Sequence, residues 1–117
     1  MKKILVIDDD RDMAETVETL LSGFYQVSVE TDNANIISHY GEFLPDLIIL
    51  DNEVGQKRAL KILEELRLHN AFNTTSIVLF SGHPDVSILA TQLKADAWLA
   101  KPFVLNDLYN CINNLLN

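Results

Sequence analysis

Short apolar segments alternate along this chain with longer segments of helical periodicity, and this alternation constrains the fold more than any other feature. Apolar runs of strand length occur five times, at Lys3–Asp8, Gln26–Glu30, Leu47–Asp51, Ser76–Ser81 and Ala97–Ala100. Each is followed by apolar side chains at helical spacing: Met13, Val17, Leu20, Leu21 and Phe24; Ile36, Ile37, Tyr40 and Phe43; Leu60, Leu63 and Leu66; Val86–Leu93; and Leu105, Leu108, Ile112 and Leu115. Five successive strand–helix units predict a mostly parallel sheet.

Three of the predicted strands are apolar on both faces. They contain Ile4–Ile7, Leu47–Leu50 and Ile77–Phe80, without the alternation expected of a half-exposed strand. Strands of this kind are covered by helices on both sides, so we expect a doubly wound α/β fold with three layers. Ligands of such sheets bind at the carboxyl ends of the strands, and we look for the functional site there.

Composition narrows the class of protein. A chain of 117 residues with 48% hydrophobic content predicts one domain over residues 1–117, without a separate output module. Nine basic residues against seventeen acidic ones give a net charge of −8, and no basic cluster favours direct nucleic-acid binding. The apolar runs are far shorter than the ~20 residues of a membrane span, and the start of the chain does not fit a signal peptide. We expect a cytoplasmic protein, and the single cysteine, Cys111, is compatible with a reducing compartment.

Acidic, hydroxyl and basic side chains stand where the predicted strands end. Asp8–Asp10 follow the first strand, Asp51 closes the third, Ser81 closes the fourth and Lys101 follows the fifth. Grouped carboxylates raise one another's pKa unless a cation lies between them. Carboxylate oxygens without a histidine or cysteine partner favour a hard ion, and Mg²⁺ typically binds through one or two carboxylates. The pattern predicts a magnesium site.

Each of these residues also has an ordinary structural interpretation. The three aspartates could cap the helix that starts near Arg11, although one cap does not need three acids. Asp51 and Ser81 could be turn residues, and Lys101 a solvated surface lysine. A calcium loop of the EF-hand type is disfavoured because it needs acids at alternating positions. The joint placement of the four segments favours a site.

Four segments carry a resemblance to a known family. They are Lys3–Asp10, Pro45–Asp51, Ile77–Gly82 and Trp98–Phe103. In this order and spacing, the sequence resembles the receiver domain of two-component response regulators over essentially the whole chain. The resemblance implies a flavodoxin-like (βα)5 fold with strand order 2-1-3-4-5.

The resemblance also implies a role for each site residue. Asp51 would be the phosphoacceptor, Asp9 and Asp51 would bind Mg²⁺ directly, Asp8 would bind it through water, and Glu53 would offer its backbone carbonyl. Lys101 would pair with Asp51 and later with the phosphoryl group.

Two further positions would transmit the signal. The Ser81 hydroxyl would reorient to hold a phosphoryl oxygen, and Trp98 stands where the family often has an aromatic switch residue. Trp98 could instead be simply packed or exposed. The Lys101–Pro102 bond is a candidate for the cis form.

Several positions depart from the common pattern of the family. Gly55 and Ala59 replace a usual proline and glycine, so we expect an unusual path for the loop after Asp51. Lys94 replaces a glycine that often ends the fourth helix, so this helix is expected to end differently. We hypothesise that Glu53 and His83 tune the attack of water on the acyl phosphate.

The remaining histidines, His39 and His69, are expected at the surface without partners. Cys111 is expected to be a small buried hydrophobic residue beside Leu108, Ile112 and Leu115.

The leading interpretation is a non-enzymatic phosphoacceptor in a His-to-Asp phosphorelay. Its donor would be a histidine kinase or a histidine phosphotransfer protein, and the face around Trp98, Leu89 and Tyr109 would engage a downstream protein or a second copy of the chain. One alternative is a magnesium-dependent phosphohydrolase with Asp51 as transient nucleophile and Glu53 as second acid. Such an enzyme needs a substrate pocket, and this chain has little room for one. A nucleotide-binding or flavin-binding module lacks its glycine-rich motif. A pseudo-receiver that cannot be phosphorylated is disfavoured because every expected site residue is present.

Overall fold

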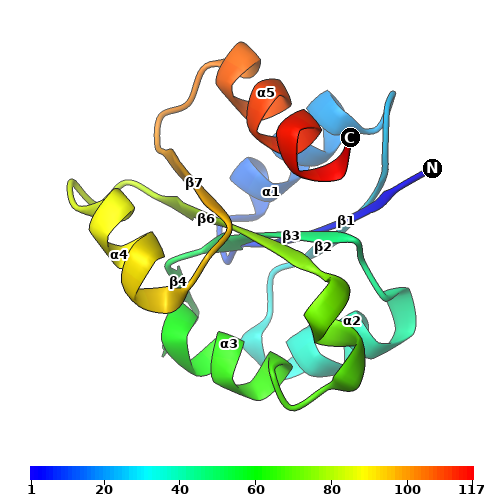
Figure 1. Cartoon of the computed structure of the whole chain (residues 1–117), viewed down its shortest axis with the longest axis vertical. Helices are drawn as coiled ribbons and strands as arrows, with labels where there is room; N and C mark the ends of the chain where they lie inside the picture. Colours follow the sequence, from blue (N-terminus) through cyan, green and yellow to red (C-terminus); the bar gives the residue numbers. More distant parts are fainter.

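Five parallel strands form the central sheet in the order β2-β1-β3-β6-β7 (Figure 1). The computed structural model describes all 117 residues. The strands are β1 (Lys3–Ile7), β2 (Gln26–Glu30), β3 (Leu47–Asp51), β6 (Ser76–Ser81) and β7 (Ala97–Ala100). Two short strands, β4 (Glu53–Val54) and β5 (Lys57–Arg58), form a separate hairpin, so the order of the five sheet strands is 2-1-3-4-5. The predicted topology is confirmed.

Helices cover both faces of the sheet. They are α1 (Arg11–Leu21), α2 (Ile36–Phe43), α3 (Ala59–Leu66), α4 (Val86–Leu93) and α5 (Leu105–Leu116), with 3-10 turns at Asn33–Asn35 and Asn70–Thr74. Helices α1 and α5 lie on one side, and α2, α3 and α4 lie on the other (Figure 1). The structure confirms the doubly wound, three-layer arrangement. No helix in it is both long enough and apolar enough to cross a membrane.

Each central strand serves two cores. Along β1 the side chains of Leu5 and Ile7 pack under α2, α3 and α4, while Ile4 and Val6 pack under α1 and α5. Strand β3 divides in the same way, and all eight apolar residues of these two strands are at most 1% exposed. Full burial of one such side chain contributes about 1.5–3 kcal/mol, which explains why the strands carry continuous apolar runs. The cores hold the strand ends, and therefore the polar residues that follow them, in fixed positions.

The loop after Asp51 forms a β-hairpin that the sequence did not predict. Strands β4 and β5 are antiparallel and are joined by the two residues Gly55 and Gln56. Gly55 has a φ of 62°, the left-handed value that such tight hairpin turns require at their first position. Val54 is fully buried and anchors the hairpin to the core below α2–α4.

Several sequence-based expectations about local structure are corrected. Helix α1 ends at Leu21, so Phe24 lies beyond it and is 64% exposed. Leu60 is exposed because the buried side of α3 consists of Ala59, Ile62, Leu63 and Leu66. The expectation that α4 ends differently at Lys94 is wrong, since this residue takes the left-handed conformation itself, with φ 58°. One expectation is confirmed: the Lys101–Pro102 bond, a candidate for the cis form, is cis.

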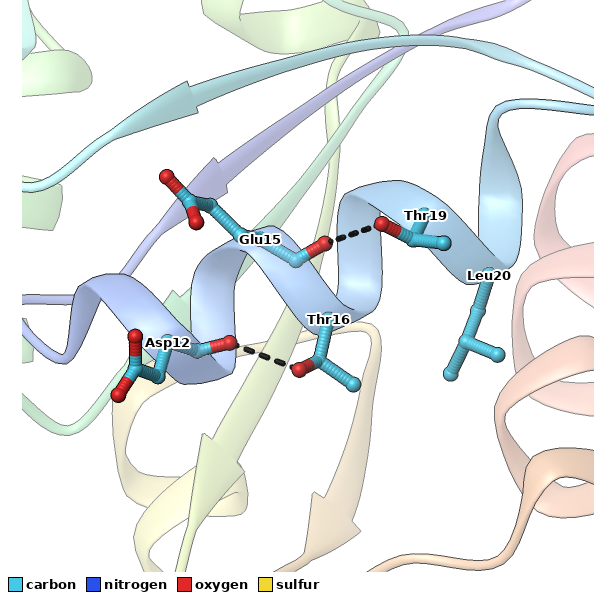
Figure 2. A pocket seen from close by; sticks show the side chains of 5 residues that line it. All are labelled: Asp12, Glu15, Thr16, Thr19 and Leu20. Atoms are coloured by element: carbon cyan, nitrogen blue, oxygen red, sulfur yellow. Dashed lines mark hydrogen bonds between the residues drawn. The ribbon is translucent and has the colours of Figure 1, made fainter.

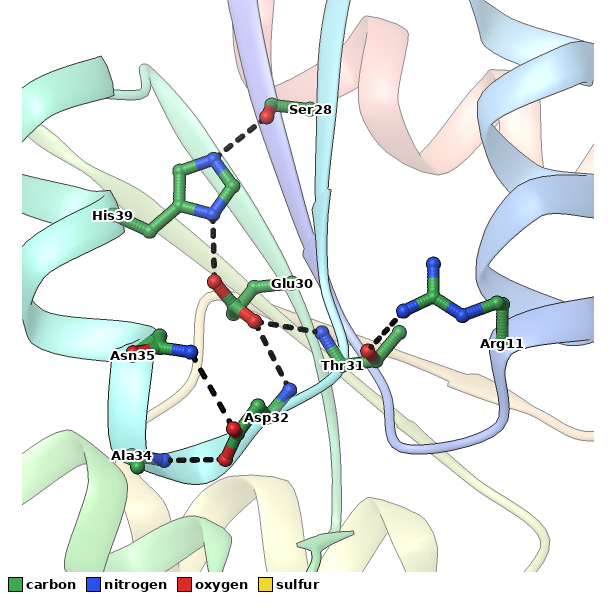
Figure 3. Close-up of polar contacts among 8 residues, drawn as sticks. All are labelled: Arg11, Ser28, Glu30, Thr31, Asp32, Ala34, Asn35 and His39. Atoms are coloured by element: carbon green, nitrogen blue, oxygen red, sulfur yellow. Dashed lines mark hydrogen bonds and ion pairs between the residues drawn. The ribbon is translucent and has the colours of Figure 1, made fainter.

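The expectation that His39 has no partner is also wrong. Its Nε2 lies 2.6 Å from the Ser28 hydroxyl, and its Nδ1 lies 3.0 Å from Oε1 of Glu30 (Figure 3). Ser28 and Glu30 alternate on β2, so both face α2 and meet the same imidazole ring. The adjacent hollow is lined by Glu30, Asn35, Ser38, His39 and Glu42, and not by Ser28. We interpret the contacts as a link between β2 and α2. His69 is half-buried, with its ring 5.7 Å from that of Tyr40.

Cys111 is half-buried beside the core under α1 and α5, and burial raises the pKa of its thiol. This matches the prediction that it packs as a small apolar side chain.

Candidate functional site

Lys101 joins the carboxylates of two different strand ends. Its Nζ donates hydrogen bonds to Oδ2 of Asp8 and to Oδ1 of Asp51, each at 3.0 Å. The same ammonium lies 4.8 Å from the centre of the Phe80 ring. Asp8 is 1% exposed, and side-chain exposure is 21% for Lys101 and 15% for Asp51, so the contacts are mostly shielded from water. Parallel strands bring these residues together because all of their carboxyl ends lie at one edge.

Three carboxylates form a cluster that fits a hard divalent cation. Asp8, Asp9 and Asp51 each offer one oxygen, and these oxygens lie within 4.8 Å of one another. The group contains no histidine or cysteine, and Mg²⁺ prefers oxygen ligands of this kind. Asp10 is not part of the cluster, since its carboxylate caps α1 by accepting from the Met13 N–H at 3.1 Å. The predicted helix cap therefore accounts for one of the three aspartates.

Excess negative charge and burial perturb the pKa values at the site. Burial raises the pKa of the Asp51 carboxyl, and repulsion from Asp8 and Asp9 adds to that effect, while Lys101 opposes it. Burial acts to lower the pKa of Lys101, but its hydrogen bonds to Asp51 and Asp8 outweigh burial, and the pKa is raised. Both shifts agree with a cluster of three carboxylates in which a single ammonium contacts two, Asp8 and Asp51. Such a cluster attracts a cation.

Ser81 lies at the end of β6 beside this cluster. It is 4% exposed, and its Oγ accepts a hydrogen bond from the His83 N–H at 3.0 Å. Its backbone carbonyl accepts from the Lys101 N–H at 2.9 Å, so Ser81 and Lys101 are tied together. The His83 ring is used locally, since its Nδ1 accepts from the Asp85 N–H at 3.0 Å.

Glu53 and Trp98 lie beyond the buried part of the site. The Glu53 side chain is 58% exposed and lies 3.7 Å from Arg58 across the hairpin. Trp98 is on β7, is 46% exposed, and lines a 350 Å³ hollow together with Pro102, Phe103 and Cys111, among others. The roles expected of Glu53 and Trp98 from the resemblance stay predictions.

The hairpin touches the site through a contact that sequence reasoning missed. The Gly55 N–H donates to Oδ2 of Asp9 at 3.3 Å. The only available signal was that Gly55 stands where the family commonly has proline, which has no N–H to donate.

Comparisons with known proteins agree with the family resemblance seen in the sequence. The family model for the response regulator receiver domain matches residues 4–113. The transcriptional regulatory protein PrrA of Mycobacterium leprae is 31% identical over 97% of this chain, and the chain spans about half of that protein's length, 49%. The chemotaxis protein CheY of Bacillus subtilis is 26% identical, with 98% of each chain covered.

Solved structures show the same fold. The chemotaxis protein CheY4 of Vibrio cholerae superposes with a TM-score of 0.89 at 22% identity, covering 99% of each chain. A signal receiver domain from Bermanella marisrubri gives a TM-score of 0.86 at 29% identity, with 98% of each chain covered. With the family match extending over nearly all of its residues, this chain belongs to the response regulator receiver domain family.

Proposed function

We propose that this domain receives a phosphoryl group on Asp51 in a His-to-Asp phosphorelay and signals through the conformational change that follows. The observation that carries the proposal is the bridge from Lys101 to Asp51 and Asp8, at 3.0 Å each, within a cluster of three carboxylates. A buried carboxylate with an adjacent cation can act as a nucleophile toward phosphorus.

The positions of the side chains support a particular transfer step. An Asp51 oxygen attacks the phosphorus of a phosphohistidine, the phosphorus–oxygen bond forms, and the phosphorus–nitrogen bond breaks as the imidazole leaves. Phosphoryl transfer needs alignment and stabilisation of charge on the equatorial oxygens. Lys101 is placed to supply positive charge, because its Nζ already touches the acceptor carboxylate. The Ser81 hydroxyl, which accepts from the His83 N–H here, would turn to donate to a phosphoryl oxygen.

Asp8, Asp9 and Asp51, with the backbone carbonyl of Glu53, would hold Mg²⁺. When bound, Mg²⁺ would offset the negative charge that accumulates among the carboxylates and the phosphoryl oxygens. The chain's own part is to hold these ligands at the strand ends.

Phosphorylation would act through the tie between Ser81 and Lys101. Both would gain contacts with the phosphoryl group, and such differential contacts shift the population between two conformations. Trp98 stands three residues before Lys101 and is 46% exposed, so its fluorescence would report a change in its surroundings. A change in that fluorescence on adding Mg²⁺ and a phosphate mimic supports the coupling, and an unchanged signal argues against it.

The phosphodonor would approach beside α1. This helix begins directly after the acidic cluster and exposes Asp12 and Glu15 next to Thr16 and Thr19 (Figure 2). The threonine hydroxyls donate to the backbone carbonyls of Asp12 and Glu15, at 2.8 and 2.9 Å, and not to their carboxylates. The Glu15 carboxylate lies 3.9 Å from the Arg11 guanidinium, so the Asp12 carboxylate makes the surface net acidic. We expect a histidine kinase or histidine phosphotransfer protein with basic side chains on its docking face.

Output to a downstream protein or to a second copy of the chain stays a prediction, and so does a cytoplasmic location.

Glu53 and His83 would tune the lifetime of the acyl phosphate. Both are exposed, and both lie within two residues of a site side chain, Asp51 or Ser81. Equal dephosphorylation rates in the wild type and the double alanine variant would refute this role.

Incubation with acetyl phosphate and Mg²⁺, followed by intact mass measurement, tests the proposal. The wild type should gain one phosphoryl group only when Mg²⁺ is present, and Asp51→Asn should gain none. Rapid turnover of phosphate esters without an adduct would instead indicate the phosphohydrolase alternative. No adduct and no turnover would indicate a pseudo-receiver that acts as an interaction module.

A further inference from the structure

The tip of the β4–β5 hairpin fits closely between two side chains. On one side the Gly55 N–H donates to Oδ2 of Asp9 at 3.3 Å. On the other side a Cβ added to Gly55 would lie 2.8 Å from Nδ2 of Asn33. The left-handed φ of 62° further favours glycine at this position, because a side chain is strained there. The amide therefore has a defined place between Asn33 and the acidic cluster.

The hairpin itself is firmly attached to the core. Val54 is fully buried, and the Ala59 N–H donates to the Asn52 carbonyl at 2.8 Å, which closes the base of the hairpin. Lys57 pairs with Glu65 of α3 at 2.9 Å. These contacts attach the hairpin to the core and to α3, and so fix the position of its tip.

The loop that carries Asn33 is also well ordered by hydrogen bonds. Oε2 of Glu30 accepts from the N–H groups of Thr31 and Asp32, at 3.1 and 3.0 Å (Figure 3). Asp32 caps the following turn by accepting from the Ala34 N–H at 2.9 Å. These hydrogen bonds hold Asn33 in place next to Gly55.

The Asp9 carboxylate depends on the Gly55 amide more than the other two carboxylates of the cluster do. The Asp8 carboxylate is held by the Asp10 N–H and by Lys101, and Asp51 is held by Lys101. Asp9 is exposed, and its only hydrogen bond within the chain comes from Gly55. Without that contact, the carboxylate would be free to turn toward solvent.

We propose that the hairpin tip is a positioning element of the metal site, in which the Gly55 amide orients the Asp9 carboxylate and Asn33 holds the amide in place. The inference rests on the proposed function, since it assigns Asp9 to Mg²⁺. A carboxylate has several lone-pair sites, so it can accept an amide hydrogen bond and bind a cation at once. Loss of a hydrogen-bonding partner of a metal ligand typically weakens metal affinity by about 10-fold to 100-fold. The long, exposed bond to Asp9 places the expected effect at the lower end, about 10-fold.

Calorimetric titration of the unphosphorylated protein with Mg²⁺ tests the role of the tip. Gly55→Ala should weaken Mg²⁺ binding by about 10-fold, because the clash with Asn33 and the strain of a side chain at φ 62° together shift the tip away from Asp9. Adding Asn33→Ala to this variant removes the steric clash and should restore part of the affinity. Gln56→Ala, at the other turn position, is the matched control and should bind like the wild type.

A second measurement guards against simple loss of folding in Gly55→Ala. In the metal-free wild type, the NMR signal of the Gly55 amide should shift on Asp9→Asn substitution, because the charge on its acceptor disappears. Unchanged Mg²⁺ affinity in a folded Gly55→Ala protein, or an unmoved Gly55 signal, overturns the positioning role while the proposed function stands. If the wild type itself binds no Mg²⁺, both proposals fail together.

Discussion

Replacing Asp9 by asparagine should have opposite effects on stability in the absence and in the presence of Mg²⁺. The substitution removes one of three negative charges whose oxygens lie within 4.8 Å of one another, and it keeps an oxygen that can accept from Gly55. Asp9 repels Asp51 in the metal-free protein and contributes to the raised pKa of that carboxyl. The variant should therefore be more stable than the wild type when Mg²⁺ is absent.

Coulomb's law sets the size of this gain. Two unit charges separated by 4.8 Å repel by about 0.9 kcal/mol at the dielectric constant of water and by about 3.5 kcal/mol at an effective value of 20. Because Asp9 is exposed, we expect a value near the lower limit, about 1 kcal/mol. Mg²⁺ binding reverses the order: at 100 times its Kd, a ligand specific for the folded state adds about 2.7 kcal/mol, so the wild type becomes more stable by roughly 2 kcal/mol.

Urea unfolding followed by far-ultraviolet circular dichroism, in EDTA and then in excess Mg²⁺, measures both effects. The unfolding midpoints of the two proteins should exchange order between the two conditions, at a constant m-value. Two outcomes would refute the reasoning. One is an Asp9→Asn variant that is less stable than the wild type in EDTA, and the other is equal stabilisation of both proteins by Mg²⁺.

Three further changes test other parts of the structure. Lys101→Arg keeps the charge but not the compact ammonium that touches two carboxylates, so phosphorylation by acetyl phosphate should slow by about 100-fold, as measured by phosphoryl incorporation. The pKa of Asp51 is raised in the folded state, so its ionised form disfavours folding, and Asp51→Asn should stabilise the protein at pH 7. Unfolding curves recorded across pH should show this gain vanishing as the pH falls below about 3.9, the pKa of an aspartate in the unfolded chain. Tyr40→Phe removes the buried hydroxyl contact with Thr75 at 3.2 Å and should lower stability by about 1 kcal/mol, seen as a fall of roughly 4 °C in Tm.

The parts of the fold that depend on continuous burial could be predicted from the sequence. Strand β3 is apolar at every position from Leu47 to Leu50, which a strand covered on both faces requires. The convergence of Asp8, Asp51 and Lys101 follows from the parallel direction of their strands, although nearly the whole length of the chain separates the first from the last.

The hairpin could not be predicted because its strands have only two residues each. Glu53, Lys57 and Arg58 are charged, so only Val54 signals burial, and one apolar residue gives no periodicity. The contact between Gly55 and Asp9 depends on that hairpin and was missed with it.

The partners of His39 were missed for a different reason. The ring meets Ser28 and Glu30 through the packing of α2 on β2, a contact between elements that helical periodicity does not describe. Alternating polar residues on the covered face of β2 were the available signal. Lys94 shows the opposite case: the backbone conformation expected of a glycine is kept although the residue has changed.

The bridge from Lys101 to Asp8 has a consequence for the order in which the protein becomes competent during synthesis. Within this domain a ribosome adds Asp8 first, then Asp51, and then Lys101, which follows Asp8 by 93 positions. Until the residues of β7 and Lys101 have emerged, the nascent chain has acidic groups at this edge without their ammonium partner. Under the proposed function, a partly synthesised domain would therefore lack the ammonium that assists phosphoryl transfer, and a kinase would encounter a usable acceptor only once β7 and Lys101 have been made.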